Sequence, residues 1–177
     1  ADMAVHQRQA DRELSVARGL FGEMQSLREQ SLQAWIEGHP DDTARQLDKA
    51  RSTAVSADRA FARAGHQLEA ALHIDGQQPE VRRALADVLL ERAMVAEAAQ
   101  LESLQDDLLQ RLTLHDSDGS HRQRWQRPAR LSISVSPAGA TVQTTRYAPD
   151  DKTRWVAMAT WSLGVVPLPT GELEPGL

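Results

Sequence analysis

The clearest hydrophobic pattern in the chain lies between Leu47 and Leu72. Eight apolar residues follow one another here at alternating spacings of three and four: Leu47, Ala50, Ala54, Ala57, Phe61, Ala64, Leu68 and Ala71. This spacing places all of them on one side of a helix, and we call them the alanine seam. Small side chains let neighbouring helices approach closely. The pattern therefore predicts a central helix with another helix on each side.

A second helical pattern precedes the alanine seam. Its apolar face is formed by Ala10, Ala17, Leu20, Met24, Leu27 and Ala34. Gly19 and Gly22 interrupt it, and each glycine costs about 1 kcal/mol relative to alanine in a helix interior. The apolar spacing nevertheless continues through both glycines. We therefore expect one long helix from Met3 to Ile36.

Turn-forming residues mark the ends of these helices. The segment from Gly38 to Pro40 ends the first helix, and Asp41 or Asp42 is suited to cap the second. An Asp-Gly pair follows Ile74, where the second helix should end. Pro79 fits the first position of a third helix, because proline has no N–H to leave unpaired there.

The third helical pattern changes its face part of the way along. Its apolar positions are Val81, Leu85, Val88, Val95 and Ala99, and then Leu101, Leu104, Leu108 and Leu112. The spacing between Ala99 and Leu101 does not continue the earlier face. This shift predicts a bend or a break at that point.

After residue 130 the pattern has a period of two. Leu131, Ile133 and Val135 alternate with serines, as in a half-buried strand. We expect strands at 131–135, 141–147 and 154–163, turns at 136–139 and 148–152, and a further strand at 171–173. Trp155 and Trp161 should share one face of their strand.

The elements together predict an α+β fold. Residues 1–115 form a bundle of three long antiparallel helices, residues 116–130 a basic linker, and residues 131–177 a small antiparallel β-domain. The stretch from Ala70 to Asp75, followed by Pro79 and Leu85-Ala86, resembles the junction between tetratricopeptide units. No fixed period recurs, so we describe the bundle only as tetratricopeptide-like.

Composition excludes several classes of protein. The net charge of −5 and the pI near 5.7 argue against a general nucleic-acid binder or a protein of anionic membranes. The chain has no cysteine, which excludes disulfides, zinc–thiolate sites and cysteine nucleophiles. It contains neither an apolar run long enough to span a bilayer nor a signal peptide. The start at Ala1 and the end after Pro175-Gly176 are typical of a piece cut from a longer protein.

Histidines and carboxylates offer the only candidate metal chemistry. His115, Asp116, Asp118 and His121 lie close together, but their spacing does not match a calcium loop. A polar linker explains them more simply. Two further histidines, at positions 66 and 73, stand two turns apart beside the alanine seam, and we interpret them as residues at the flank of the bundle. A metal-dependent or other enzyme that uses His66, His73, His115 and His121 remains the alternative.

The linker carries the one patch with nucleic-acid character. It combines Arg122, Arg124, Trp125, Arg127 and Arg130. Since the protein is acidic overall, we expect these arginines to contact acidic helix surface such as that at Asp106 and Asp107. Trp125 should then pack at the joint between helices and sheet. Weak nucleic-acid binding through this patch is the alternative.

The two strand tryptophans are the other candidates for an interaction surface. Trp155 and Trp161 are among only four tryptophans in the chain. Tryptophans on one strand face belong more often to a core than to a ligand platform, and we expect a core here. An exposed pair would instead extend the interaction surface of Arg122, Arg124, Trp125 and Arg127.

The β-rich part resembles a PEGA domain, a small bacterial β-domain. Three motifs carry the resemblance: Pro137-Ala-Gly-Ala-Thr-Val142, Gly164-Val-Val-Pro-Leu168 and Leu173-Glu-Pro-Gly176. With the helical block before it, the chain is similar to one group of bacterial serine/threonine protein kinases. In that group a kinase domain precedes tetratricopeptide-like helices and a PEGA-like sheet, and a domain like the formylglycine-generating enzyme often follows. The chain stops where this family continues into a closing strand, so the resemblance implies a truncated sheet.

The resemblance implies a non-catalytic function. The chain has no glycine-rich phosphate loop, no His-Arg-Asp and no Asp-Phe-Gly. We therefore expect a sensory or scaffolding region that takes part in signal transduction, without a cofactor, and that binds a protein partner, a small ligand or another copy of itself. By analogy with the family, it would belong to an extracytoplasmic or periplasmic part of a protein whose membrane anchor lies outside this chain, and a cytoplasmic location is the alternative.

Overall fold

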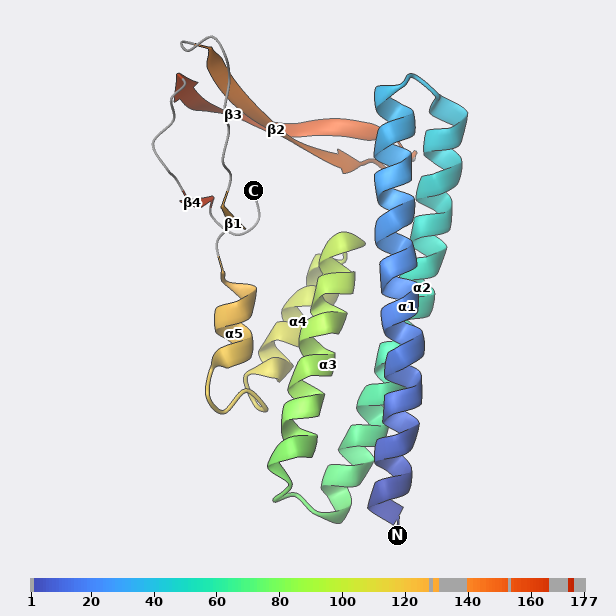
Figure 1. Cartoon of the computed structure of the whole chain (residues 1–177), viewed down its shortest axis with the longest axis vertical. Coiled ribbons are helices and arrows are strands. Elements are labelled where there is room, and N and C mark those ends of the chain that lie inside the picture. The colour runs from blue at the N-terminus through green and yellow to red at the C-terminus, as the bar shows by residue number, and fades with distance from the viewer. Residues whose placement is uncertain (1, 128, 131–139, 153, 166–171, 174–177) are drawn as a thin grey trace.

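The computed structural model describes residues 2–127, 129–130, 140–152, 154–165 and 172–173. Long antiparallel helices are followed by a β-hairpin (Figure 1). The helices are α1 (Asp2–Ile36), α2 (Pro40–Ile74), α3 (Pro79–Ala98), α4 (Glu102–Leu112) and α5 (Ser120–Trp125). The strands are β1 (Ala129–Arg130), β2 (Thr141–Pro149), β3 (Trp155–Val165) and β4 (Glu172–Leu173). Among the described residues, no helix combines the length and the apolar character needed to cross a membrane.

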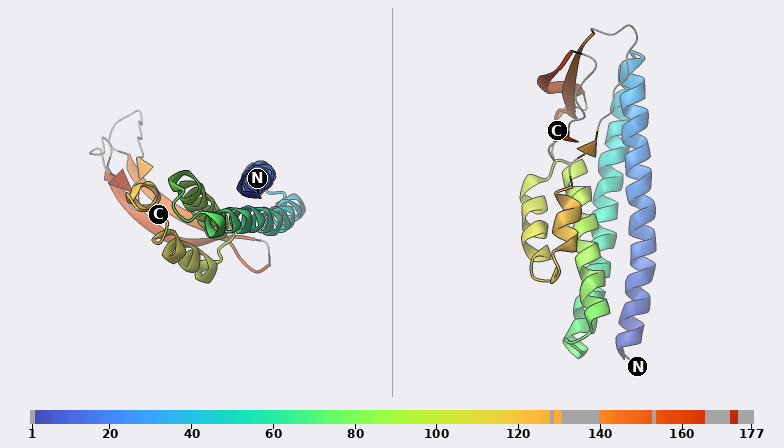
Figure 2. Two further views of the ribbon diagram at one scale, coloured as in Figure 1. Left: turned by 90° about the horizontal axis from the view of Figure 1, so that it is seen from below. Right: turned by 60° about the vertical axis from the view of Figure 1, so that its left-hand side comes forward.

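The predicted alanine seam is confirmed. All eight of its residues are buried, and Ala57, Phe61 and Ala64 have no exposed surface. α2 lies between α1 and α3, as the view along the helices shows (Figure 2). Its alanines therefore bring the three helix axes together, and larger residues such as Met24, Leu85 and Val88 fill the space around them.

The turn between α1 and α2 lies where we expected it, but the prediction that Asp41 or Asp42 caps the start of α2 is wrong. Gly38 takes a φ of 80°, and the amide of His39 donates to the carbonyl of Ala34 at 2.8 Å. α2 then begins at Pro40, and neither Asp41 nor Asp42 caps it, because His39 occupies the cap position without a side-chain bond. The proline sets the helix start without a capping side chain.

The predicted break in the third helix is confirmed. α3 ends at Ala98, and Gln100 takes a φ of 59°, a left-handed conformation that a continuous helix does not contain. The amide of Leu101 donates to the carbonyl of Ala96 at 2.9 Å, which closes the turn before α4. Since α3 has 20 residues and α2 has 35, α3 covers only part of the length of α2.

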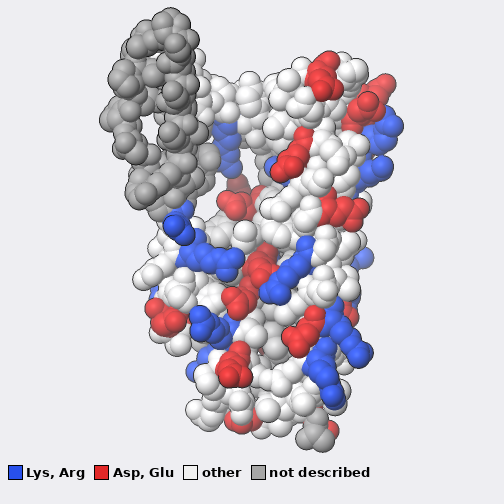
Figure 3. Space-filling view, in the orientation of Figure 1, with Lys and Arg blue, Asp and Glu red and all other residues white. Residues whose placement is uncertain are grey.

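Ion pairs connect neighbouring helices. In the described part of the chain, four arginine–carboxylate pairs join different helices: Arg18–Glu91, Arg63–Glu13, Arg92–Asp58 and Arg111–Glu69, at 2.6–2.9 Å. Another pair, Asp48–Arg51, lies within α2 at 3.9 Å. The exposed pairs contribute about 0–1 kcal/mol each, whereas Arg92–Asp58 is part-buried. On the face in Figure 3, both signs of charge are interspersed.

Among the described residues of the β-part, β2 pairs with β3 and β1 with β4, both antiparallel. The strands expected at 141–147 and 154–163 are present, and Glu172–Leu173 pairs within the segment expected at 171–173. The strand at 131–135 and the turn at 136–139 lie outside the described residues. The register shifts between Arg146 and Tyr147, which interrupts the alternation expected to give Trp155 and Trp161 a common face. Trp155 is buried and Trp161 is half-buried.

Candidate functional site

The turn between β2 and β3 lies against the part of the α1–α2 hairpin that α3 leaves uncovered. Trp155, the first residue of β3, is buried there. Its indole Nε1–H donates to the hydroxyl of Ser31 at 3.0 Å, and that hydroxyl donates to the carbonyl of Thr43 at 3.0 Å. Ser31 and Thr43 are buried polar residues on α1 and α2. These two hydrogen bonds give the buried indole N–H of Trp155 and the buried hydroxyl of Ser31 a partner each.

Arginine and aromatic side chains hold the rest of this joint. The guanidinium of Arg28 lies 5.5 Å from the ring centroid of Trp155 and donates to the carbonyl of Ala98 at the end of α3. Burial lowers the pKa of Arg28. The ring of Trp35 contacts that of Tyr147 with centroids 4.9 Å apart, and Arg51 donates to the carbonyl of Asp150 at 2.6 Å.

A groove opens beside this joint. Its volume is about 470 Å³, and it is bounded by α2, the α3–α4 junction and the β2–β3 turn. The walls are mainly apolar: Ala54, Val55, Val95, Ala96, Ala99, Leu101, Leu104 and Pro149. Charged side chains stand among them: Arg51, Asp58, Arg59 and Asp151. Apolar walls with a few charged groups are typical of small-molecule sites.

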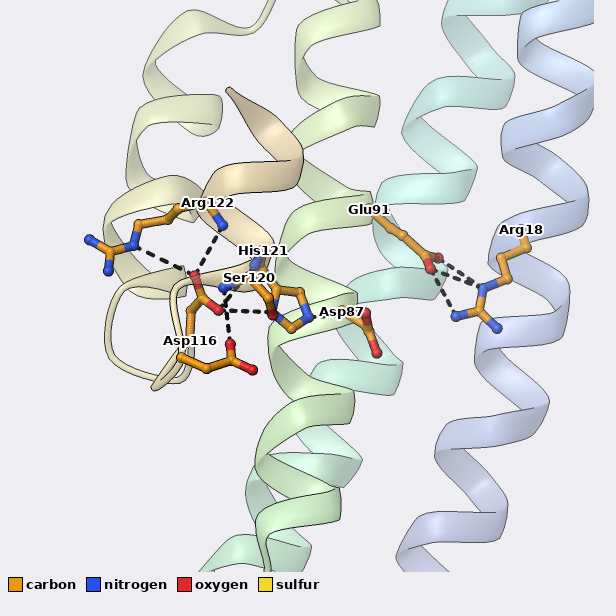
Figure 4. Close-up of polar contacts among 8 residues, drawn as sticks. Arg18, Asp87, Glu91, Asp116, Ser120, His121 and Arg122 are labelled. Atoms are coloured by element: carbon orange, nitrogen blue, oxygen red, sulfur yellow. Dashed lines mark hydrogen bonds and ion pairs between the residues drawn. The ribbon is translucent and has the colours of Figure 1, made fainter. Parts of the chain in front are cut away.

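The predicted linker contains a second cluster of polar contacts (Figure 4). Asp116 accepts hydrogen bonds from the backbone amides of His121 and Arg122, at 3.1 and 3.0 Å, and from His121 Nδ1 at 2.9 Å. The other ring nitrogen of His121 lies 3.0 Å from Asp87 on α3. Each ring nitrogen of His121 thus faces one carboxylate. The cluster therefore fastens the start of α5 to α3.

Burial raises the pKa of Asp116, but the hydrogen bonds from Arg122 and His121 outweigh this effect. The pKa of Asp116 is lowered from 3.8 to about 2. A carboxyl whose pKa is lower in the folded state stabilises the fold above its unfolded pKa. That stability is lost as the pH falls through the folded pKa. Asp116 therefore loses its stabilising effect as the pH falls from 3.8 to about 2.

We expect Asp116→Asn to lower the free energy of unfolding by about 1–2 kcal/mol near neutral pH, because an amide oxygen replaces a charged acceptor. The difference from the wild type should shrink as the pH falls through the window of 3.8 to about 2. Urea unfolding over a pH series measures this difference in the free energy of unfolding. The control is Asp106→Asn, a change at an exposed residue of α4. A difference that stays constant across this window would contradict the assigned role.

Ser120, His121 and Asp116 are the residue types of a hydrolase catalytic triad. Their geometry, however, is not that of a triad. Ser120 Oγ lies 3.4 Å from His121 Nδ1, whereas Asp116 lies 2.9 Å from the same nitrogen. A triad needs the histidine nitrogen that faces the nucleophile to be free to accept its proton. Here Asp116 already bonds that nitrogen, so the arrangement stabilises structure instead of activating a hydroxyl.

Three residues of this cluster lie close enough to hold one metal ion. Potential ligand atoms of Asp116, Asp118 and His121 are within 4.8 Å of one another, and His115 lines the same cavity of about 420 Å³. Two arginines, at positions 82 and 83, also line it and oppose a cation. The carboxylates already accept backbone amides, including that of Ser120 on Asp118. These hydrogen bonds therefore account for the cluster without an ion.

The structure separates the predicted candidate residues. His66 is exposed and contacts Glu69, and His73 is exposed at the end of α2, so neither joins His115 and His121. Arg122, Arg124 and Arg127 are exposed on or beside α5, and Trp125 packs against the helical core. Arg122 lies 3.5 Å from Asp116 of the predicted linker, and not against Asp106 or Asp107 of α4. Trp155 is buried at the joint and does not belong to the same surface.

The residues that form the joint were not found from the sequence. Ser31 interrupts the apolar face of α1 one turn after Leu27, and Thr43 precedes the alanine seam by one turn. These two small polar residues, at facing positions of α1 and α2, were the available signal for a third element. A buried hydroxyl needs a hydrogen-bond partner, and that partner can come from another element. The partner, Trp155, is 124 residues from Ser31, which is beyond any local pattern.

Comparison with known proteins gives no match: no family model, no curated protein and no solved structure is similar to this chain.

Proposed function

We propose that this chain is a non-catalytic scaffolding region that holds attached domains at a fixed separation and orientation. The observation that carries the proposal is the joint at Trp155. It connects the β-hairpin to α1 and α2 through a buried hydrogen-bond chain and the Arg28 contact. The buried alanine seam supports the same function, because closely packed helices resist bending.

The parent protein in this proposal is a bacterial serine/threonine protein kinase of the tetratricopeptide-like and PEGA-like group. The motifs that begin at Pro137, Gly164 and Leu173 support the assignment, and the helices followed by a β-hairpin are consistent with it. The region would take part in signal transduction by binding a protein partner, a ligand or a second copy. A gene that encodes no kinase domain next to this region would contradict the assignment.

Rigidity is the property to test, and the absence of cysteine makes the test simple. Val5 on α1 and Met158 on β3 are both exposed, so cysteines at these two positions can carry spin labels. Electron–electron double resonance should give one narrow distance distribution if the hairpin is held in place. A broad distance distribution between labels at Val5→Cys and Met158→Cys would contradict a scaffolding function. The control for label mobility is the pair Val5→Cys and Val16→Cys, because both positions lie on α1.

A further inference from the structure

One face of α1 is exposed along the whole length of the helix. It consists of the positions that follow Val5 at alternating spacings of three and four, through Arg8 and Arg12, as far as Ile36, and we call it the outer face. All ten of these positions are exposed. α1 lies at the margin of the bundle (Figure 2), which leaves room for another helix along the outer face.

Both ends of the outer face carry a large apolar side chain. Val5 is 48% exposed and Ile36 is 64% exposed. Each would gain free energy from burial against another apolar side chain. The two residues lie about 46 Å apart along the helix axis. A partner that covers both must therefore be long and must offer an apolar residue at each of its ends.

The charges of the outer face are divided between its two halves. Arg8 and Arg12 lie in the half that begins at Val5, and Glu29 lies in the half that ends at Ile36. Within the described ranges of the chain, neither Arg12 nor Glu29 forms an ion pair. The face is therefore complementary to a helix that carries its acidic and basic halves in the opposite order.

The middle of the outer face has no large side chain. Gly19 and Gly22 lie at its centre, between Ser15 and Ser26. A Cβ at either glycine would meet nothing within 4 Å, so the packing of the bundle does not require a glycine at these positions. Each glycine also weakens the helix relative to alanine. The centre of the face is thus shaped for the close approach of a second helix.

We propose that the outer face binds the outer face of a second copy of this chain in an antiparallel dimer with two-fold symmetry. Reversing the direction of the second copy places Arg12 of each copy opposite Glu29 of the other. The same alignment brings Val5 opposite Ile36 and the two glycines to the symmetry axis. A parallel dimer would instead place Arg12 against Arg12 and Glu29 against Glu29, and these like charges repel.

This inference rests on the proposed function and deepens it. The proposed scaffold binds a protein partner, a ligand or a second copy, and the outer face selects the second copy. Two scaffolds joined along α1 in opposite directions would hold two parent proteins together. The antiparallel direction is what distinguishes this dimer from other modes of self-association.

Charge reversal at positions 12 and 29 tests the dimer and its direction. Sedimentation velocity from about 1 μM to 1 mM should show a monomer–dimer equilibrium for the wild type. Arg12→Glu and Glu29→Arg should each weaken the dimer at least about tenfold, because each creates two like-charge contacts per dimer. The variant with both changes restores opposite charges across the interface and should recover the wild-type affinity. Positions 12 and 29 lie about 25 Å apart on one helix, so no contact within a single chain can cause this recovery.

Two further variants separate loss of the dimer from loss of the fold. Gly22→Leu meets open space in the monomer, so it should retain the far-UV circular dichroism and weaken the dimer at least about tenfold. Arg124→Glu reverses the charge of an exposed arginine on α5, away from the outer face, and should leave the dimer unchanged.

A single spin label reports the direction directly. Gln9 is exposed on α1 beside the outer face. Labels on Gln9→Cys in the two copies should lie about 35 Å apart in the antiparallel dimer, because 23 residues separate the two positions along the axis. A distance below about 20 Å would indicate parallel helices and would overturn the inference.

Other results would also overturn it: a monomer at every concentration, a dimer that Arg12→Glu leaves intact, or a double variant as weak as the single ones. The distance between positions 5 and 158 is measured separately, on labelled chain mixed with excess unlabelled chain. A narrow distribution together with a monomer would refute the dimer alone. A broad distribution together with an antiparallel dimer would refute the rigid scaffold alone.

Discussion

Replacing Trp155 with alanine is expected to release the β-hairpin from the helices. Truncation of a buried tryptophan costs about 3–5 kcal/mol, and Trp155 is 8% exposed. The change also leaves the hydroxyl of Ser31 without its donor and the guanidinium of Arg28 without its ring. The label distance between positions 5 and 158 should therefore broaden, while far-UV circular dichroism should retain the helices.

Two further variants separate the contributions to this joint. Trp155→Phe keeps an aromatic ring near Arg28 and loses the N–H donor, so it should cost about 1 kcal/mol. Trp161→Ala removes a half-buried tryptophan of the same strand and should have a smaller effect than Trp155→Ala. If Trp161→Ala and Trp155→Ala destabilise the protein equally, Trp155 is not the anchor.

The double variant Ala57→Leu/Ala64→Leu should destabilise the helical bundle by about 2–6 kcal/mol. Neither alanine has exposed surface, and inserting larger side chains into a packed core costs about 1–3 kcal/mol at each site. The two positions are seven residues apart, about 10 Å along the axis, so their effects should add. Urea unfolding followed by far-UV circular dichroism measures the change.

The matched control is Ala4→Leu, because Ala4 is an exposed alanine on α1. It introduces the same side chain without entering a helix–helix interface, and surface changes of this kind usually stay within about 0.5 kcal/mol. A double variant as stable as the control would mean that α1 and α3 do not approach α2 at Ala57 and Ala64.

The helices were predictable because the pattern that identifies each helix lies within a short stretch of sequence. The alanine seam repeats over seven turns, and the break at Gln100 shows as a change of face over a few residues. The end of the first helix was equally visible at Gly38. Helix α5 was missed because its six residues are too few to show a period, and the cluster at Asp116 holds it through contacts with distant Asp87.

The joint was not predictable for the opposite reason. Trp155 was expected in a core, and it is buried, but its partners lie on helices at the other end of the sequence. A strand pattern shows which side chains avoid water and not which element covers them. The register shift near Tyr147 also moves side chains between the two faces, which period-two reasoning does not anticipate.

The length of chain between Ser31 and Trp155 has a consequence for how the protein folds. α1 and α2 are neighbours in sequence and pair through a short loop, whereas the contact that closes the joint spans 124 residues. Contacts of such high sequence separation form late, because the entropy of closing the intervening loop must be overcome first. During synthesis, the part of α1 and α2 around Ser31 and Thr43 therefore stays uncovered until Trp155 has left the ribosome.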